Sequence, residues 1–403
     1  MPNAGFATRR ILNVLLRRFH ERNPGIRVKT CVFPWSTVWD RLMAVLKQGH
    51  SPLSPDVIQI GSTWTSTLAY LGALQDLTPY GDRMDPGDFF PTIFNSCRQP
   101  ETGKLHAVPW FMDVRVLYYR RDILRSLGVK TEELQTWSSF QRVCRWVTRS
   151  QKKKKNFHTL ALSGQKEQVR LQDLAPWIWS AGGRFFTDDE KRAAFHQESA
   201  LEGIHFFFSL MAEGCIPLLG RDRFASGDFF NGQAVFQFSG AWPLESHFKK
   251  GAALYHRGVA ENFGVVPFPQ GPAGHFTYLG GSHLAVSSGS RHPEESRELL
   301  RFLTSREAQL PHARAIGRLP CRQSEIQGLF MRTPEVGRVF QESLGHARML
   351  PQVPALGTLE RLFMRCTSDI VKMIVDRRFS RGRLHGRLCQ AAQETNYLPS
   401  LYA

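Results

Sequence analysis

Three observations predict an α/β protein with two domains. The chain has 403 residues, which is more than one hydrophobic core usually organises, so two domains are expected. Apolar runs typical of buried strands, such as residues 55–60, alternate with segments of helical periodicity, such as residues 35–47. Hydrophobic residues make up 42% of the chain and aromatic residues 11%, so each domain can bury a core of its own.

The expected elements follow this alternation along the whole chain. The spacing of apolar residues predicts helices that begin near Thr8 and Pro293 and others over 35–47, 65–74, 121–127, 136–148, 198–214 and 359–375. Extended segments are predicted over 26–33, 55–60, 105–119, 234–238, 277–279 and 284–286. The run at 55–60 has the composition of a strand buried in a parallel sheet. The extended run at 105–119 is long for one small domain, which fits a strand that passes between two lobes.

The stretch 276–309 shows how one of these units is assembled. An extended segment is predicted to be broken by Gly280 and Gly281, and a short apolar strand follows it. A helix then begins at Pro293, because proline suits the first helical position. Glu294 and Glu295 follow where the helix dipole favours anions. The stretch therefore predicts a chain crossing anchored by a capped helix.

Charge and cysteine content narrow the possible partners. The net charge is +17, which suits an anionic partner such as nucleic acid or a membrane surface, or a generally basic surface. The basic residues are scattered through the chain, which favours the second interpretation, and the lysine run at 151–156 is interpreted as a solvated turn. The seven cysteines include no C-x-x-C pair and the histidines no H-E-x-x-H, so no metal site is expected. No apolar run reaches the roughly 18 residues of a membrane span.

Five segments in order carry a resemblance to a known family. They read PDVIQIGSTW, VPWFMDVRVLYYRRDIL, FFNGQAVFQFSGAW, GGSHLAVSSGSRHPEE and GRLP. Together they resemble family 1 extracellular solute-binding proteins, the sugar-capturing receptors of ABC importers. The resemblance implies the type II periplasmic-binding-protein fold, in which two α/β lobes joined by about three strands close like a hinge on a ligand cleft. The crossings are expected near Asp113, Tyr278 and Ile316, so that residues 1–113 and 279–315 form lobe 1 and residues 114–278 and 316–403 form lobe 2.

The resemblance also implies which residues contact a ligand. A sugar offers apolar faces to aromatic rings and hydroxyl groups to charged side chains and backbone amides. Trp242 is expected as a stacking plane, with Trp177 or Trp179 as a second one, Asp113 as a hydroxyl-binding carboxylate and Arg318 as a donor. Thr63 and Trp64 follow a strand at its carboxyl end, and Gly280 and Gly281 would let backbone amides approach the ligand. Each has a structural alternative, because a tryptophan can belong to a core, glycines can serve a bend, and Asp113 can pair with Arg115 or Arg120.

Two departures from the family pattern accompany the resemblance. Family members often place an aromatic residue before the late helix, where this chain reads VPALGTLERL, so preference among sugars is expected to differ. The start, MPNAGFATRR, shows no apolar core or cleavage site of an export signal. Family members normally begin with such a signal and a first strand. We expect a truncated N-terminus, with a protein that is not exported as the alternative.

The function implied by the resemblance is the substrate-binding component of an ABC importer. It would capture a mono- or oligosaccharide or a polyol and deliver it to membrane permease subunits, as a monomer peripheral to the membrane in a periplasmic or extracellular location. No catalytic residue, cofactor or nucleic-acid partner is expected, because neither a G-x-S-x-G motif nor basic residues interleaved with aromatic ones are recognisable. The alternatives are a solute sensor that feeds a membrane signalling receptor and a basic nucleic-acid-binding protein.

Overall fold

The computed structural model describes residues 6–47, 54–151, 157–162, 169–190, 192–216, 218, 229–244, 257–329, 333–354 and 356–397. The chain folds into two units. Unit 1 comprises Met1–Asp113, Gly280–Thr333 and Gln352–Pro354, and unit 2 comprises Val114–Leu279, Pro334–Pro351 and Ala355–Ala403. The lysine run predicted as a solvated turn lies, from residue 152 on, outside the described residues.

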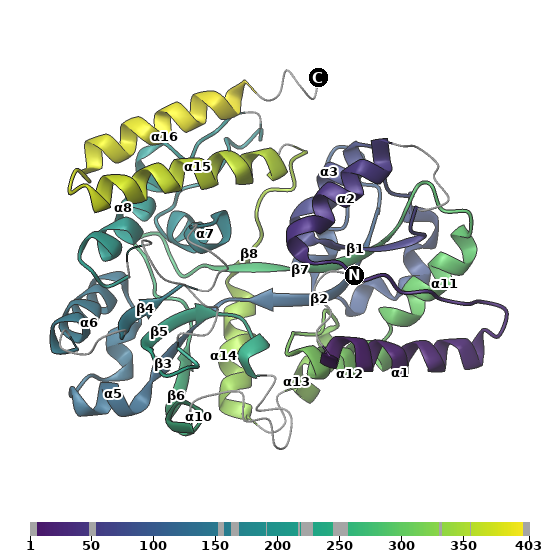
Figure 1. Ribbon diagram of the computed structural model, residues 1–403, viewed down its shortest axis with the longest axis horizontal. Coiled ribbons are helices and arrows are strands. Elements are labelled where there is room, and N and C mark those ends of the chain that lie inside the picture. The colour runs from purple at the N-terminus through teal and green to yellow at the C-terminus, as the bar shows by residue number, and fades with distance from the viewer. Residues whose placement is uncertain are drawn as a thin grey trace. The chain divides into compact units, whose positions relative to one another are not determined.

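Unit 1 is built on strand β1 (Val57–Gly61) and on the unit 1 parts of β7 (Thr277–Val286) and β2 (Val108–Val114). The strand order is β1-β7-β2, with β1 antiparallel to β7. Its helices are α1 (Phe6–Arg22), α2 (Trp35–Lys47), α3 (Thr65–Tyr70), α4 (Pro91–Asn95), α11 (Pro293–Leu303), α12 (Arg306–Ile316) and α13 (Gln323–Leu329), with short 3-10 turns η1 (Ser62–Trp64), η2 (Thr78–Met84) and η3 (Pro86–Asp88). Helix α1 packs beside α12 and α11 (Figure 1), where the rings of Phe19 and Phe302 lie 5.5 Å apart.

Unit 2 is built on a second sheet in the order β4-β5-β3-β6. These strands are β4 (His158–Ala161), β5 (Ala234–Ser239), β3 (Val116–Arg120) and β6 (Phe263–Val266), and β8 (Ala347–Arg348) pairs with the start of β7. Its helices are α5 (Arg121–Ser126), α6 (Trp137–Ser150), α7 (Leu171–Ser180), α8 (Glu198–Ala212), α10 (Arg257–Asn262), α14 (Pro334–Gly345), α15 (Leu356–Val375) and α16 (Arg381–Asn396), with 3-10 turns η4 (Thr131–Leu134) and η5 (Trp242–Leu244). The yellow helices α15 and α16 pack side by side (Figure 1).

The core of unit 2 is an aromatic cluster. Trp177 is 1% exposed, and its ring centroid lies 5.4 Å from Trp137, 5.3 Å from Phe206 and 4.6 Å from Phe268. Phe238 of β5 meets Trp177 edge-on at 5.5 Å. Such edge-to-face and offset pairs are the favoured geometries of aromatic rings. The cluster thus joins α6, α7 and α8 to the sheet.

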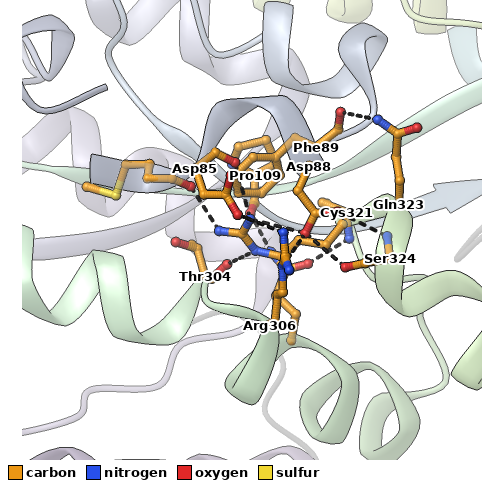
Figure 2. Close-up of polar contacts among 12 residues, drawn as sticks. Asp85, Asp88, Phe89, Pro109, Thr304, Arg306, Cys321, Gln323 and Ser324 are labelled. Carbon is orange, nitrogen blue, oxygen red and sulfur yellow. Dashed lines mark hydrogen bonds and ion pairs between the residues drawn. The ribbon is translucent and has the colours of Figure 1, made fainter. Parts of the chain in front are cut away.

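Unit 1 is tied instead by a polar network around the buried side chain of Arg322. Its Nε donates to the carbonyl of Thr304 at 2.7 Å and its Nη2 to the carbonyl of Met84 at 2.9 Å. Asp88 lies 3.4 Å from Nη1 and also accepts from the hydroxyl of Ser324 at 2.9 Å. Figure 2 shows Asp85, Asp88 and Ser324 around this network. Burial lowers the pKa of Arg322, which is the expected effect of desolvating a cation.

This network explains a difference from the predicted lobe boundaries. Residues up to Thr333 belong to unit 1, whereas the third crossing was predicted near Ile316. Arg322 and Ser324 hold the segment after α12 against η2 and η3, and Gln323 donates to the carbonyl of Phe89 at 2.9 Å. The other two boundaries fall after Asp113 and after Leu279.

Three local predictions are corrected. Residues 26–33 alternate in polarity but form no strand, because within the described residues they pair with no neighbouring strand beyond a single bridge position at Phe33. Gly280 and Gly281 do not break an extended segment, since β7 runs through both of them. The strand predicted for a parallel sheet, β1, pairs antiparallel with β7.

Candidate functional site

Asp113 and Arg318 form an ion pair at the end of β2 in unit 1. An Nη1 of Arg318 lies 3.6 Å from an Oδ1 of Asp113, and the two side chains are 29% and 13% exposed. The pairing follows from the backbone, because Met112 and Leu319 exchange two hydrogen bonds of 2.9 and 3.0 Å. Gly317 ends α12 with φ of +65°, a left-handed conformation that glycine adopts without strain. The turn therefore places Arg318 next to Asp113, the residue after Met112.

The glycines of β7 lie beside this pair. A Cβ atom on Gly281 would come within 2.3 Å of the carbonyl oxygen of Phe111, a distance that no real side chain tolerates. Glycine is therefore required there for β2 and β7 to approach each other. The ring of Phe111 also lies 6.0 Å from the guanidinium of Arg318. Close backbone packing therefore accounts for Gly281, rather than the bend given as the structural alternative, and Gly280 is buried in the same strand.

Thr63 and Trp64 follow β1 in the short turn η1. Gly61 pairs with Ser282 in the β1–β7 register, so this turn begins beside the glycines of β7. Thr63 is buried at 9% exposure. Trp64 is partly exposed and meets Trp39 edge-on, with ring centroids 5.1 Å apart. Adjacent strands thus bring Thr63, Trp64, the glycine pair, Asp113 and Arg318 to one end of the unit 1 sheet.

Trp242 lies in unit 2, in the turn η5 that follows β5. The bend before it is fixed by Tyr118, whose hydroxyl donates to the carbonyl of Gly240 at 2.7 Å. Val116 pairs with Ser239, so Trp242 follows β5 at the end of the unit 2 sheet where β3 begins. Its indole is partly exposed, with the ring of Phe230 6.5 Å away. An aromatic face of this kind is available to an apolar surface.

The other two predicted tryptophans occupy the core of unit 2. Trp177 is 1% exposed within the aromatic cluster, and Trp179 is 5% exposed with its ring edge-on to Phe185 at 6.2 Å. Both sit on α7, whose buried face they fill. Neither offers a free ring face, which contradicts the expectation of a second stacking plane at Trp177 or Trp179.

A polar contact between α7 and α15 was not anticipated from the sequence. The Nε2 of Gln172 donates to an Oε1 of Glu360 at 3.1 Å. Burial raises the pKa of Glu360 to about 7, although Gln172 and the cations Arg170 and Arg361 act in the opposite direction. A glutamate in an amphipathic helix is indistinguishable in the sequence from a solvated one, so only the packing reveals it. Phe111 and Trp39 were missed for the same reason, because both gain their neighbours from distant segments.

The described residues also bear on metals and membranes. They contain no group of three or more histidine, cysteine, aspartate or glutamate side chains that could hold a metal ion. None of the helices in the described ranges is long and apolar enough to cross a membrane.

Comparison with known proteins identifies the protein family to which this chain belongs. Residues 7–310 match the family of bacterial extracellular solute-binding proteins. A probable ABC transporter-binding protein of Deinococcus radiodurans is 26% identical over 67% of this chain and 63% of its own length. A sn-glycerol-3-phosphate-binding periplasmic protein of Shigella dysenteriae is 21% identical over 68% of this chain and 62% of its own length. The maltose-bound structure of T. maritima MalE3 superposes with a TM-score of 0.80 at 23% identity, covering 96% of both chains.

The chain therefore belongs to the bacterial extracellular solute-binding protein family. Its fold is the two-lobe fold of periplasmic sugar-binding proteins, which confirms the fold and the family predicted from the sequence. The matches span less than two thirds of the length of the two curated relatives named above.

Proposed function

We propose that this protein captures a carbohydrate or polyol and delivers it to the permease subunits of an ABC importer. Residues of both units would hold the solute, and the protein would leave it chemically unchanged. The observation that carries the proposal is the Asp113–Arg318 pair at the end of the unit 1 sheet. It is supported by family membership and by the maltose named for a protein of the same fold.

The ion pair suits the hydroxyl groups of such a solute. A carboxylate accepts a hydrogen bond from a hydroxyl and a guanidinium donates one, and charged partners make these bonds stronger than neutral ones. Asp113 and Arg318 are both partly buried and partly exposed. Their separation of 3.6 Å lets adjacent hydroxyls of one ring be recognised in pairs.

Trp242 would supply the apolar contact. The C–H face of a pyranose ring stacks against an indole, and burial of that face favours binding. Solute contacts in both units would shift the protein toward the conformation that binds it, since a ligand shifts an equilibrium only by its differential affinity. The permease would then recognise that conformation of a monomeric protein outside the cytoplasm. The same capture step would serve a sensor, so importer-dependent uptake distinguishes the two roles.

Calorimetric titration of the full chain with a panel of sugars, polyols and sn-glycerol 3-phosphate tests this proposal. Trp242→Ala is expected to weaken binding by roughly 1–3 kcal/mol, the value of burying a large apolar side chain. Trp146→Ala is the matched control, because Trp146 is 46% exposed on α6 of the same unit. Asp113→Ala is expected to weaken binding as well. Absence of binding across the panel, or salt-sensitive binding of oligonucleotides instead, would overturn the proposed function.

A further inference from the structure

Unit 1 has a concave surface that is lined by none of the residues discussed above as ligand contacts. It consists of two cavities of about 710 and 360 Å3. They share Arg83, Met84, Glu298 and Arg301, so they form one continuous groove along α11 and η2. We call it the arginine groove.

The lining of the arginine groove is strongly charged. Six arginines line it: Arg22, Arg83, Arg297, Arg301, Arg306 and Arg322. Four carboxylates line it as well: Asp85, Glu294, Glu298 and Glu307. The cations are therefore in excess, in a hollow whose walls concentrate the electrostatic potential.

Most of these arginines are already committed to carboxylates. Arg22 pairs with Glu307 at 2.7 Å, and Arg301 pairs with Glu298 at 2.6 Å. Arg306 and Arg322 belong to the network with Asp85 and Asp88. These pairs fix the walls of the groove. The donors that remain free to bind a ligand therefore belong to the other two arginines.

The other two arginines are Arg83 and Arg297, which both lie over the ring of Tyr80. Arg83 is exposed, and among the described residues no carboxylate lies within ion-pair distance of it. Its guanidinium is 5.8 Å from the centre of the Tyr80 ring, and that of Arg297 is 4.0 Å from the same centre. Both cations therefore lie near the Tyr80 ring in the lining of the smaller cavity.

Arg297 carries an unmet donor. Its side chain is only 13% exposed. One end of the guanidinium pairs with Glu294, and Nη1 donates to Gln75 at 3.3 Å. Its Nε is buried and has no acceptor within the described part of the chain. A buried N–H without an acceptor is rare in folded proteins, and an acceptor oxygen of a ligand is one way to satisfy it.

We propose that the arginine groove binds the phosphate group of a second ligand. A phosphate offers several acceptor oxygens and negative charge, which match the unmet Nε of Arg297, the excess of cations and Arg83, whose guanidinium has no carboxylate partner among the described residues. The groove has room for more than a phosphate ion, so it can accommodate the phosphate of a larger molecule, either a free phosphate ester or the headgroup of an anionic phospholipid. This site is independent of the carbohydrate site.

Titration of the full chain with inorganic phosphate and pyrophosphate, at constant ionic strength set with chloride, tests the proposal. Arg83→Ala and Arg297→Lys are each expected to weaken phosphate binding at least tenfold, the second because lysine keeps the charge but loses the Nε–H. Arg291→Ala is the matched control, since Arg291 is exposed in the same unit and lines neither cavity. A parallel experiment with phosphatidylglycerol vesicles, against phosphatidylcholine vesicles, separates the two sources.

Each possible outcome either supports the phosphate site or overturns it. Binding of either phosphate probe or of phosphatidylglycerol vesicles that is lost in both groove variants and kept in Arg291→Ala supports the site and identifies its source. Equal loss in all three variants would show a general charge effect and overturn the proposal, as would no binding in any experiment. Sugar affinity is expected to be unchanged in the groove variants, so failure here leaves the proposed function standing.

Discussion

The two units have similar layers but are held together by different interactions. In unit 2 the sheet and helices meet through the aromatic cluster around Trp177, whereas in unit 1 the buried Arg322 connects three loops through carbonyls and carboxylates. An aromatic cluster is insensitive to charge, and a buried cation depends on every partner it has. The comparison teaches that stability and proton binding must be treated separately in each unit.

The strongest test of this difference is removal of the central ring of unit 2. Trp177→Ala is expected to destabilise unit 2 by about 3–5 kcal/mol, because it removes a large buried ring and leaves a cavity. Hydrogen exchange followed by mass spectrometry would locate the effect in peptides of α6, α7 and α8. Trp146→Ala, on an exposed face of α6, is expected to change stability by less than about 0.5 kcal/mol. Equal acceleration of exchange in both units would contradict separate cores.

The corresponding test in unit 1 is Arg322→Ala. It removes the donor of the carbonyls of Met84 and Thr304 and one of the two cations that contact Asp88, so unit 1 is expected to lose about 3 kcal/mol or more. Exchange is expected to accelerate in η2, η3 and α13. Arg306→Ala removes an exposed partner of Asp88 in the same network and is expected to have a smaller effect. If the two variants behaved alike, burial would not be what makes Arg322 important.

The two units are also expected to differ in how their stability depends on pH. In unit 2 the group that makes stability depend on pH is Glu360. Burial raises its pKa to about 7 from 4.5, so between these values the folded protein holds a proton that the unfolded chain has released. The contribution of the protonated Glu360 to the free energy of unfolding is therefore fully present below pH 4.5, and it is lost as the pH rises toward 7. Glu360→Gln is expected to stabilise unit 2 by about 2 kcal/mol at pH 8 and to have little effect at pH 4. Denaturant unfolding of Glu360→Gln and of the wild type at both pH values measures this effect. If the substitution stabilised the protein equally at pH 4 and pH 8, this role of Glu360 would be refuted.

The sequence predicted the elements of both units well, because their apolar periodicity is local. Helix 35–47 and strand β1 needed only the spacing of their own residues. The strand expected at 26–33 failed, since alternation without a partner strand cannot show whether a ladder forms. The third lobe boundary, predicted near Ile316, differs from the end of unit 1 at Thr333, because that end depends on Arg322, whose partners in η2 and η3 are more than 200 residues away.

The candidate site was predictable in part. Asp113 and Arg318 came from the resemblance to a family, and the structure shows them as a pair. The exposure of Trp242 and the burial of Trp177 could not be told apart in the sequence, because both are tryptophans in apolar surroundings. Side-chain exposure is decided by tertiary packing, which local patterns do not encode.

The smallest expected effect concerns two buried histidines of unit 1. Burial lowers the pKa of His312 and of His283 to about 3, so below pH 6.5 the unfolded chain binds protons that the folded protein does not. Both residues therefore cost stability as the pH falls from 6.5 toward 3, opposite to Glu360. They differ in hydrogen bonding, because His283 contacts Thr65 at 2.8 Å, whereas neither ring nitrogen of His312 has a partner among the described residues.

This contrast predicts opposite results for one substitution. His312→Phe keeps the stacking on Trp110, whose ring centroid is 4.2 Å away, and removes two buried polar atoms. It is expected to stabilise unit 1 by about 1 kcal/mol at pH 7, with a larger gain at pH 5. His283→Phe leaves Thr65 without its partner and is expected to destabilise unit 1 at pH 7. Denaturant unfolding of both variants at pH 5 and pH 7 checks this prediction. A loss of stability in His312→Phe would contradict it. That result would mean that the ring nitrogens of His312 are hydrogen-bonded, since phenylalanine cannot replace those bonds.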